Sequence, residues 1–294
     1  MTEFRAVFDA IVHFANGGDL RVTGFRIDLP SPHVDEAEIG TLFLTSLGLL
    51  MTGSVRLSNV SIIEEAHKGT RGVPVARQSE RRFVELNHVI TDGMVTYPGL
   101  PGPEITVHQG REVEYAPGTS FAIDRLSMVG NSGTYLDSPY HRWADGADLA
   151  GIGLDRTVDL PAVVVRVAGA GSRAVGTGML AALDVHGAAV LLHTGDSARF
   201  GTPEYAEDAH YLTEDGARLL ADRGAALVGI DAVNIDAVAD RTRPAHSILL
   251  RAGISIVEHL TGLDRIPATG ARFSAVPLRI SGFGTVPVRA YATV

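Results

Sequence analysis

From residue 83 to the C-terminus, short runs of apolar residues alternate with longer segments that carry a helical pattern. Residues 162–167 and 188–193 are so rich in valine, leucine and alanine that we expect both to be buried strands. Further strands are expected at residues 226–231, 254–258, 273–280 and 286–292, and helices at residues 212–223 and 245–252. Because strand–helix–strand repetition builds a sheet with helices packed on it, residues 83–294 are predicted to form an α/β domain.

Residues 1–66 have a different pattern, which predicts a small separate α+β module. The sequence N-G-G-D at residues 16–19 is typical of a hairpin turn, because these residues tolerate positive φ. The expected elements are strands at residues 8–13, 22–29 and 55–63 and a helix from about residue 35 to residue 51. This ββαβ module has no cluster of candidate catalytic residues, so we expect it to serve packing or oligomerisation. Residues 67–82 are polar, basic and turn-rich, and they are interpreted as a linker.

The composition excludes several classes of function. A formal net charge of −9 disfavours binding to nucleic acid or to anionic membranes. The chain has no cysteine, which rules out disulfides, thiolate metal sites and cysteine nucleophiles. The N-terminus lacks the pattern of a signal peptide, and the longest apolar stretch, residues 39–51, is too short and broken to span a bilayer. A cytoplasmic protein that acts on a small molecule is therefore expected.

The segment N-S-G-T-Y-L-D-S-P-Y-H, residues 131–141, contains the first group of candidate site residues. Asp137 comes just before Ser138 and Pro139, and the proline restricts Ser138 to extended geometry. An aspartate beside such a stiffened segment, four residues from His141, suits metal binding or proton transfer. By spacing alone, however, such a pair is more often part of a hydrogen-bonded structure.

A second group lies near the end of the chain. Glu258 ends an apolar strand, where a carboxylate is costly to bury unless it meets a cation, a metal or hydrogen-bond donors. A partly exposed strand end is the alternative interpretation. His246 stands at the start of an expected helix, where a histidine is otherwise an ordinary cap or surface residue.

Together, these segments resemble the cyclase family of metal-dependent hydrolases, which includes the bacterial kynurenine formamidases. The family pattern H-x-G-T-H-x-D-x-P-x-H has the spacing of residues 131–141, and the family's later histidine stands twelve residues before a glutamate, as His246 does before Glu258. Other matching segments are residues 97–99, 193–195, 227–231, 245–267 and 276–290. The resemblance covers residues 83–294 and implies an α/β fold of the swivelling β/β/α type that is usually dimeric, so we expect a homo-oligomer.

The resemblance also implies a site with two divalent ions. It assigns one ion to the first two histidines of the pattern together with the aspartate and the glutamate, and the other ion to Asp137, His246 and Glu258. The last histidine of the pattern, His141, is then the general acid/base, and Tyr97 stands where the family has an aromatic residue that contacts the substrate.

This chain departs from the pattern at the first two histidines, which are Asn131 and Tyr135 here. A neutral asparagine is a poor ligand for zinc, and a phenol with a pKa near 10 must lose its proton before it binds a metal well. The site of the first ion is therefore expected to be incomplete. Arylformamidase activity itself is doubtful for the same reason.

Two catalytic interpretations follow, and a third is non-catalytic. In the first, Asp137, His246 and Glu258 hold one divalent ion, zinc or manganese, and His141 transfers protons while a small amide, lactam, ester or lactone is hydrolysed. In the second, no metal is bound, and an acid/base cluster with Tyr135 and Asn131 as hydrogen-bond donors runs a cyclisation, isomerisation or dehydration. In the third, the chain is a small-molecule binder on an enzyme scaffold.

Three residues are candidates for substrate binding: Tyr97, Ser132 and Trp143. Trp143 also suits core packing, as tryptophan often does. Arg243 has two interpretations, because it is suited to an anionic substrate but a loop arginine is usually solvated.

Overall fold

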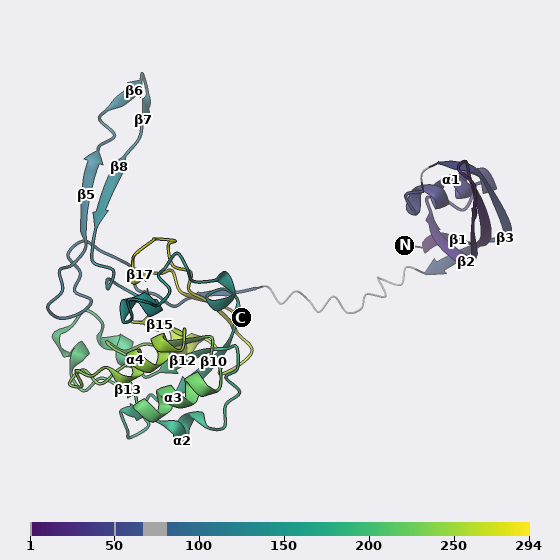
Figure 1. Cartoon of the computed structure of the whole chain (residues 1–294). Helices are drawn as coiled ribbons and strands as arrows, with labels where there is room; N and C mark the ends of the chain where they lie inside the picture. Colours follow the sequence, from purple (N-terminus) through teal and green to yellow (C-terminus); the bar gives the residue numbers. More distant parts are fainter. Residues whose placement is uncertain (1, 50, 67–80) are drawn as a thin grey trace. The chain divides into compact units, whose positions relative to one another are not determined.

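The computed structural model describes residues 2–49, 51–66 and 81–294. The chain divides into two compact units, Met1–Glu80 and Arg81–Val294 (Figure 1). The expected linker lies outside the described residues except for its last two. Within the described ranges, no helix combines the length and the apolar character needed to cross a membrane.

The first unit is a three-stranded antiparallel sheet with one helix. Strand β1 (Thr2–Phe14) lies between β2 (Asp19–Leu29) and β3 (Thr52–Ala66), and helix α1 (Glu36–Ser46) joins β2 to β3. Phe8 of β1 and Phe43 of α1 pack edge to face in its core. The element order is the expected ββαβ, but the helix ends at Ser46 rather than near residue 51, because Gly48 takes a left-handed φ of 61°.

The second unit is organised around a nine-stranded mixed sheet. Its order is β17 (Thr285–Pro287), β9 (Tyr135–Asp137), β15 (Ser255–Glu258), β14 (Leu227–Ile230), β12 (Ala189–His193), β10 (Leu160–Arg166), β16 (Arg272–Ser274), β18 (Tyr291–Thr293) and β4 (Phe83–Glu85). Strands β15, β14, β12 and β10 are parallel, and the strands on either side of them are antiparallel.

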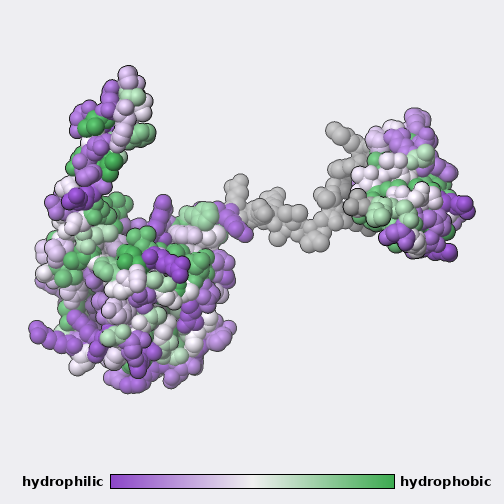
Figure 2. Space-filling view, turned by 45° about the horizontal axis from the view of Figure 1, so that its top comes forward, coloured by the Kyte–Doolittle hydropathy of each residue, from purple (hydrophilic) through white to green (hydrophobic). Residues whose placement is uncertain are grey.

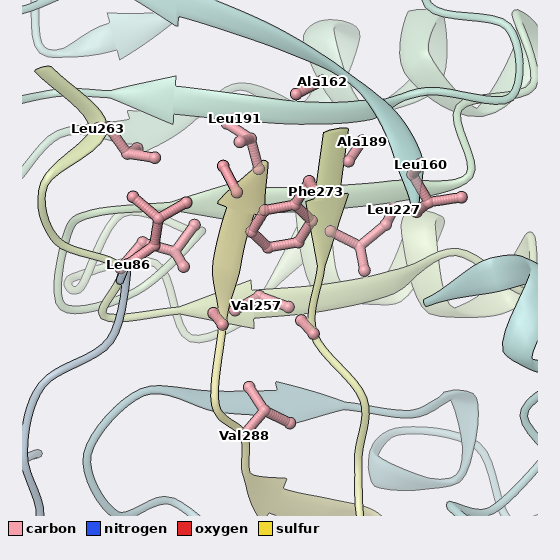
Figure 3. Packing of buried hydrophobic residues seen from close by; sticks show 14 of the residues in the cluster. Leu86, Leu160, Ala162, Ala189, Leu191, Leu227, Val257, Leu263, Phe273 and Val288 are labelled. Carbon is pink, nitrogen blue, oxygen red and sulfur yellow. The ribbon is translucent and has the colours of Figure 1, made fainter. Parts of the chain in front are cut away.

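The two faces of this sheet have separate hydrophobic cores. Helices α2 (Thr177–Leu180), α3 (Glu214–Asp222) and α4 (Pro244–Arg251) cover one face, where Leu220 and Leu249 pack against Ile256 (Figure 1). The other core gathers around Phe273, which lies among Leu191, Leu227 and other apolar side chains (Figure 3). In this mixed α/β domain, as expected, the four parallel strands β10, β12, β14 and β15 contribute side chains to both cores.

Two expected strands differ from the structure. The strand expected at 273–280 is only three residues long, β16. The strand expected at 286–292 is divided into β17 and β18, which pair with different neighbours. Pro287 ends β17, because a proline has no amide hydrogen with which to extend the ladder.

A long hairpin between residues 104 and 127 was not expected from the sequence. Strand β5 (Glu104–Gln109) pairs with β8 (Ile123–Ser127), and β6 (Glu114–Ala116) pairs with β7 (Thr119–Ser120) beyond them. The hairpin projects from the rest of its unit, and its surface is a mixture of polar and apolar residues (Figures 1 and 2). The remaining short elements are β11 (Ala174–Val175), β13 (Tyr211–Leu212), η1 (Pro139–His141), η2 (Leu154–Arg156), η3 (Asp196–Arg199), η4 (Pro203–Ala206) and η5 (Leu263–Arg265).

Candidate active site

Strand register brings the two groups of candidate residues together. Tyr135 of β9 lies opposite Glu258 of β15, and Asp137 lies opposite Thr285 of β17. Because side chains alternate along a strand, Tyr135 and Asp137 share the face that α4 covers, while Leu136 points into the opposite core. Residues that are far apart in the sequence thus meet on three adjacent strands.

Helix α4 adds His246 to this face. The Nε2 atom of His246 lies 3.6 Å from Asp137 Oδ2 and 3.5 Å from Glu258 Oε1. Its Nδ1 lies 2.6 Å from Asp236 Oδ2, and the other oxygen of Asp236 accepts a hydrogen bond from the backbone of Ala245 at 2.6 Å. We infer that Nδ1 donates to Asp236, so Asp236 fixes the orientation of the ring and directs Nε2 at the two carboxylates.

Thr285 connects Asp137 with His141. Its hydroxyl donates to Asp137 Oδ1 and lies 2.8 Å from His141 Nδ1. A hydroxyl has one hydrogen, and this one is given to Asp137, so Nδ1 of His141 must be the donor to Thr285. In the neutral ring, Nε2 of His141 then carries no proton, and 36% of this side chain is exposed. His141 is therefore suited to accept a proton from a molecule in the pocket.

Tyr135 and Glu258 belong to a buried hydrogen-bond chain. The Tyr135 hydroxyl donates to Glu258 Oε2 at 2.7 Å and lies 3.2 Å from Nε2 of His259, whose Nδ1 lies 3.0 Å from the hydroxyl of Tyr205. The backbone N–H of Ile235 donates to Glu258 Oε1 at 2.6 Å. Each oxygen of Glu258 thus has a donor, and Tyr135 acts as a hydrogen-bond donor at a position where the family resemblance implies a histidine.

Burial and neighbouring charges shift the pKa values of this cluster in opposite directions. Burial, with the charge of Asp137, raises the pKa of Glu258 to about 7, although the charge of His246 opposes the shift. Burial disfavours the charged form of His246, but Glu258, Asp137 and Asp236 outweigh it and raise the pKa of His246 to about 10. Burial and the two carboxylates raise the pKa of Tyr135 well above its usual value, so its phenol stays protonated.

The residues present fit a divalent cation. Asp137 Oδ2 is buried and has no hydrogen-bond partner, which is costly for a carboxylate oxygen. Ligand atoms about 2.1 Å from one ion in tetrahedral arrangement lie about 3.4 Å apart, close to the separations of His246 Nε2 from Asp137 and Glu258. Among the described residues, Asp137, His141 and His246 also offer ligand atoms within 4.8 Å of one another. Glu258 is not in that group, but it is a further candidate ligand because its Oε1 lies 3.5 Å from Nε2 of His246.

His141, His246 and Glu258 open onto a pocket of about 340 Å³, whereas Asp137 is fully buried and is not in its lining. It is lined by Tyr97, Leu100, Asn131, Tyr135, His141, Arg142, Asn234, Arg243, His246 and Glu258. Ser132 and Trp143 are not in this lining. Ser132 is buried and donates to the carbonyl of Val129 at 2.8 Å, and the indole N–H of Trp143 donates to the carbonyl of Ser247 at 3.2 Å.

The structure adds residues that were not singled out from the sequence. Asp236 and Thr285 touch His246 and His141, and Asn234 and Leu100 line the pocket. A carboxylate ten residues before a candidate ligand histidine is the signal that could have identified Asp236, because ligand histidines usually donate to such a group.

Comparison with known proteins identifies relatives of this chain. The Cyclase family model matches residues 84–237, just over half of the chain. A kynurenine formamidase from Bacillus cereus is 26% identical over 209 residues, which are 71% of this chain and 95% of that protein. A kynurenine formamidase from Delftia acidovorans is 27% identical over 210 residues, 71% of this chain and 96% of that protein.

Solved structures share the fold. The structure of a predicted metal-dependent hydrolase from Bacillus stearothermophilus is 28% identical, with a TM-score of 0.58 over 72% of this chain and 98% of that one. Isatin hydrolase A from Labrenzia aggregata is 24% identical, with a TM-score of 0.64 over 75% of this chain and 96% of that one. The residues that the family model matches lie within the second unit. From the family match and the shared fold, this chain belongs to the Cyclase family.

Proposed function

We propose that this chain is a hydrolase that cleaves a small amide, lactam, ester or lactone, with one divalent ion and His141 as general acid/base. The observation that carries the proposal is the buried, unpartnered Oδ2 of Asp137, which lies 3.6 Å from Nε2 of His246, while His246 and Glu258 line the pocket. The relatives named kynurenine formamidase and the structure named isatin hydrolase support hydrolysis of a C–N bond. Zinc and manganese are the ions to test first.

When bound, a divalent ion held by Asp137, His246 and Glu258 would polarise the scissile carbonyl and lower the pKa of water in the site. Nε2 of His141 takes the proton of the attacking water and returns it to the leaving nitrogen or oxygen. The hydrogen bond from Nδ1 to Thr285, and the carboxylate of Asp137 behind it, stabilise the protonated ring between these two transfers.

A second candidate is a metal-independent acid/base enzyme. It is favoured by Glu258, whose pKa of about 7 suits proton transfer near neutral pH and whose oxygens both already accept hydrogen bonds. In this candidate, the charged His246 lies beside Asp137 and Glu258 and balances their charge without an ion, and the reaction is an isomerisation, dehydration or ring closure. Activity after chelation distinguishes the two candidates.

The proposal is tested by turnover of a panel of formylanilides, lactams and lactones by the metal-loaded protein. At least one compound should be hydrolysed, and His141→Gln should lower its kcat about 10²- to 10⁴-fold. His186→Gln is a matched control, because His186 is exposed and remote from this pocket. Hydrolysis that His141→Gln leaves intact would refute the role of His141.

A further inference from the structure

Arg243, the N-cap residue of helix α4, has an unusual backbone conformation. Its φ is 51°, in the left-handed region, and the next residue, Pro244, is the first residue of the helix. Non-glycine residues rarely take this conformation, and those that do so are concentrated at functional sites. The conformation places the Arg243 side chain in the lining of the pocket.

Three contacts hold the guanidinium of Arg243. Nη1 donates to the backbone carbonyl of Ala237 at 2.9 Å and also lies 3.4 Å from the carbonyl of Val238. Nη2 lies 3.4 Å from the hydroxyl of Tyr97, which is another lining residue. Both terminal nitrogens of the guanidinium thus contact neutral oxygens, which do not neutralise its charge.

Among the residues that the structure describes, neither Arg243 nor Arg142 forms an ion pair, although both line the pocket. The pKa of Asp240 is lowered mainly by hydrogen bonds from the hydroxyl and the N–H of Thr242, at 2.7 and 2.9 Å, and to a smaller degree by the charge of Arg243. Arg142 lies over the ring of Trp143, with 4.4 Å between its guanidinium carbon and the ring centroid.

The charges of the lining therefore favour an anion. If Asp137 and Glu258 hold a divalent ion, as proposed above, their two negative charges balance it. The two arginines are then the remaining charges of the lining, because Asp236 lies behind His246 and is not part of it. A pocket of about 340 Å³ has room for a compound with a single ring.

We propose that Arg243 binds a carboxylate of the substrate, and that the enzyme acts on small aryl or cyclic amides which carry this anionic group away from the scissile bond. Planar guanidinium groups bind carboxylates with two parallel hydrogen bonds, which neutral compounds cannot reproduce. The inference rests on the proposed hydrolase function for its catalytic part only, because binding of an anion does not require turnover.

The first test is binding of phenylacetate and of phenylacetamide to the metal-loaded protein by calorimetry. We expect the carboxylate to bind at least tenfold more tightly than the amide. Arg243→Gln should abolish this preference, and so should Arg243→Gly, which is compatible with the left-handed backbone. Arg218→Ala, which changes an exposed arginine paired with Glu214 on α3, should preserve the preference. Equal binding of both compounds would overturn the proposal, as would a preference that persists in both Arg243 variants, which would mean that the carboxylate binds the ion.

The second test is hydrolysis of formanilide and of its carboxylated analogue, 3-formamidobenzoate. We expect Arg243→Gln to raise KM for the carboxylated compound at least tenfold and to change KM for formanilide by less than twofold. If both compounds are hydrolysed and the substitution changes KM equally for both, the proposed carboxylate-binding role of Arg243 is wrong while the hydrolase function stands. If neither compound is hydrolysed but the binding preference depends on Arg243, the carboxylate-binding role of Arg243 is supported and the hydrolase function fails.

Discussion

At the scale of single residues, Tyr135 distinguishes this chain from the family pattern. Its phenol stays protonated and donates to Glu258 at 2.7 Å, so it is a hydrogen-bond donor to a carboxylate that we propose as a ligand, where the resemblance implies a ligand histidine. With Asn131 also in the pocket lining, one of the two implied ion sites lacks both of its histidines. This is the physical basis for expecting one ion instead of two.

The double variant Asn131→His/Tyr135→His should therefore bind a second divalent ion. Both positions line the pocket and lie beside the carboxylates, and histidine supplies the neutral nitrogen ligand that zinc favours. Metal analysis should show an increase from about one equivalent to about two. The double variant Asn131→Gln/Tyr135→Phe is the control and should gain no ion. An unchanged metal content in the histidine variant would contradict the assignment of these two positions.

His259 should make the folded state sensitive to acid. Burial, with the nearby His88, lowers its pKa to about 3, whereas an unfolded histidine titrates near 6.5. Between these values the unfolded chain binds a proton that the folded protein does not, so stability falls as pH falls through this window.

From this group alone, the free energy of unfolding should fall by up to about 1.4 kcal/mol per pH unit between pH 6 and pH 4. Urea unfolding at several pH values measures the slope, which His259→Gln should reduce. The exposed His186→Gln should keep the wild-type slope. Identical slopes in wild type and His259→Gln would show that His259 is not held neutral.

At the scale of elements, close packing of one loop against η1 sets the position of His141. A Cβ added to Gly284 would lie 2.8 Å from His141 Cα and 2.9 Å from its backbone nitrogen. Gly284 has no positive φ, so alanine there changes sterics without requiring a different backbone.

Gly284→Ala should thus displace His141 and lower kcat at least tenfold, because small displacements of a catalytic group are costly. Its metal content should stay at the wild-type level, since Asp137, His246 and Glu258 come from other elements. Gly178→Ala, where no atom lies within 4 Å of the added Cβ, is the matched control. A fully active Gly284→Ala protein would argue against His141 as the general acid/base.

Much of the element order was predictable because most elements have a local sequence signal. The parallel strands are apolar runs, and helix α3 has Thr213 as its N-cap, whose hydroxyl accepts from the N–H of Gly216 at 3.2 Å. The hairpin of β5 and β8 was missed because its strands are exposed and have no buried face to impose a pattern. Thr285 was missed because its role depends on pairing with Asp137, 148 residues away, and a single sequence carries no signal of that register.

At the scale of the whole molecule, the chain has two units with separate hydrophobic cores. The candidate site, the pocket and both layers of the nine-stranded sheet belong to Arg81–Val294. The chemistry therefore depends on whether the second unit holds an ion between Asp137, His246 and Glu258.

The most direct test is metal analysis of the purified full-length protein, combined with activity before and after chelation. We predict about one equivalent of zinc or manganese, loss of hydrolysis on chelation, and recovery when the ion is returned. Asp137→Ala should bind no ion, and Asp145→Ala, which changes an exposed aspartate paired with Arg251, should bind as much as wild type. Metal far below one equivalent, with activity that survives the chelator, would contradict the single-ion hydrolase.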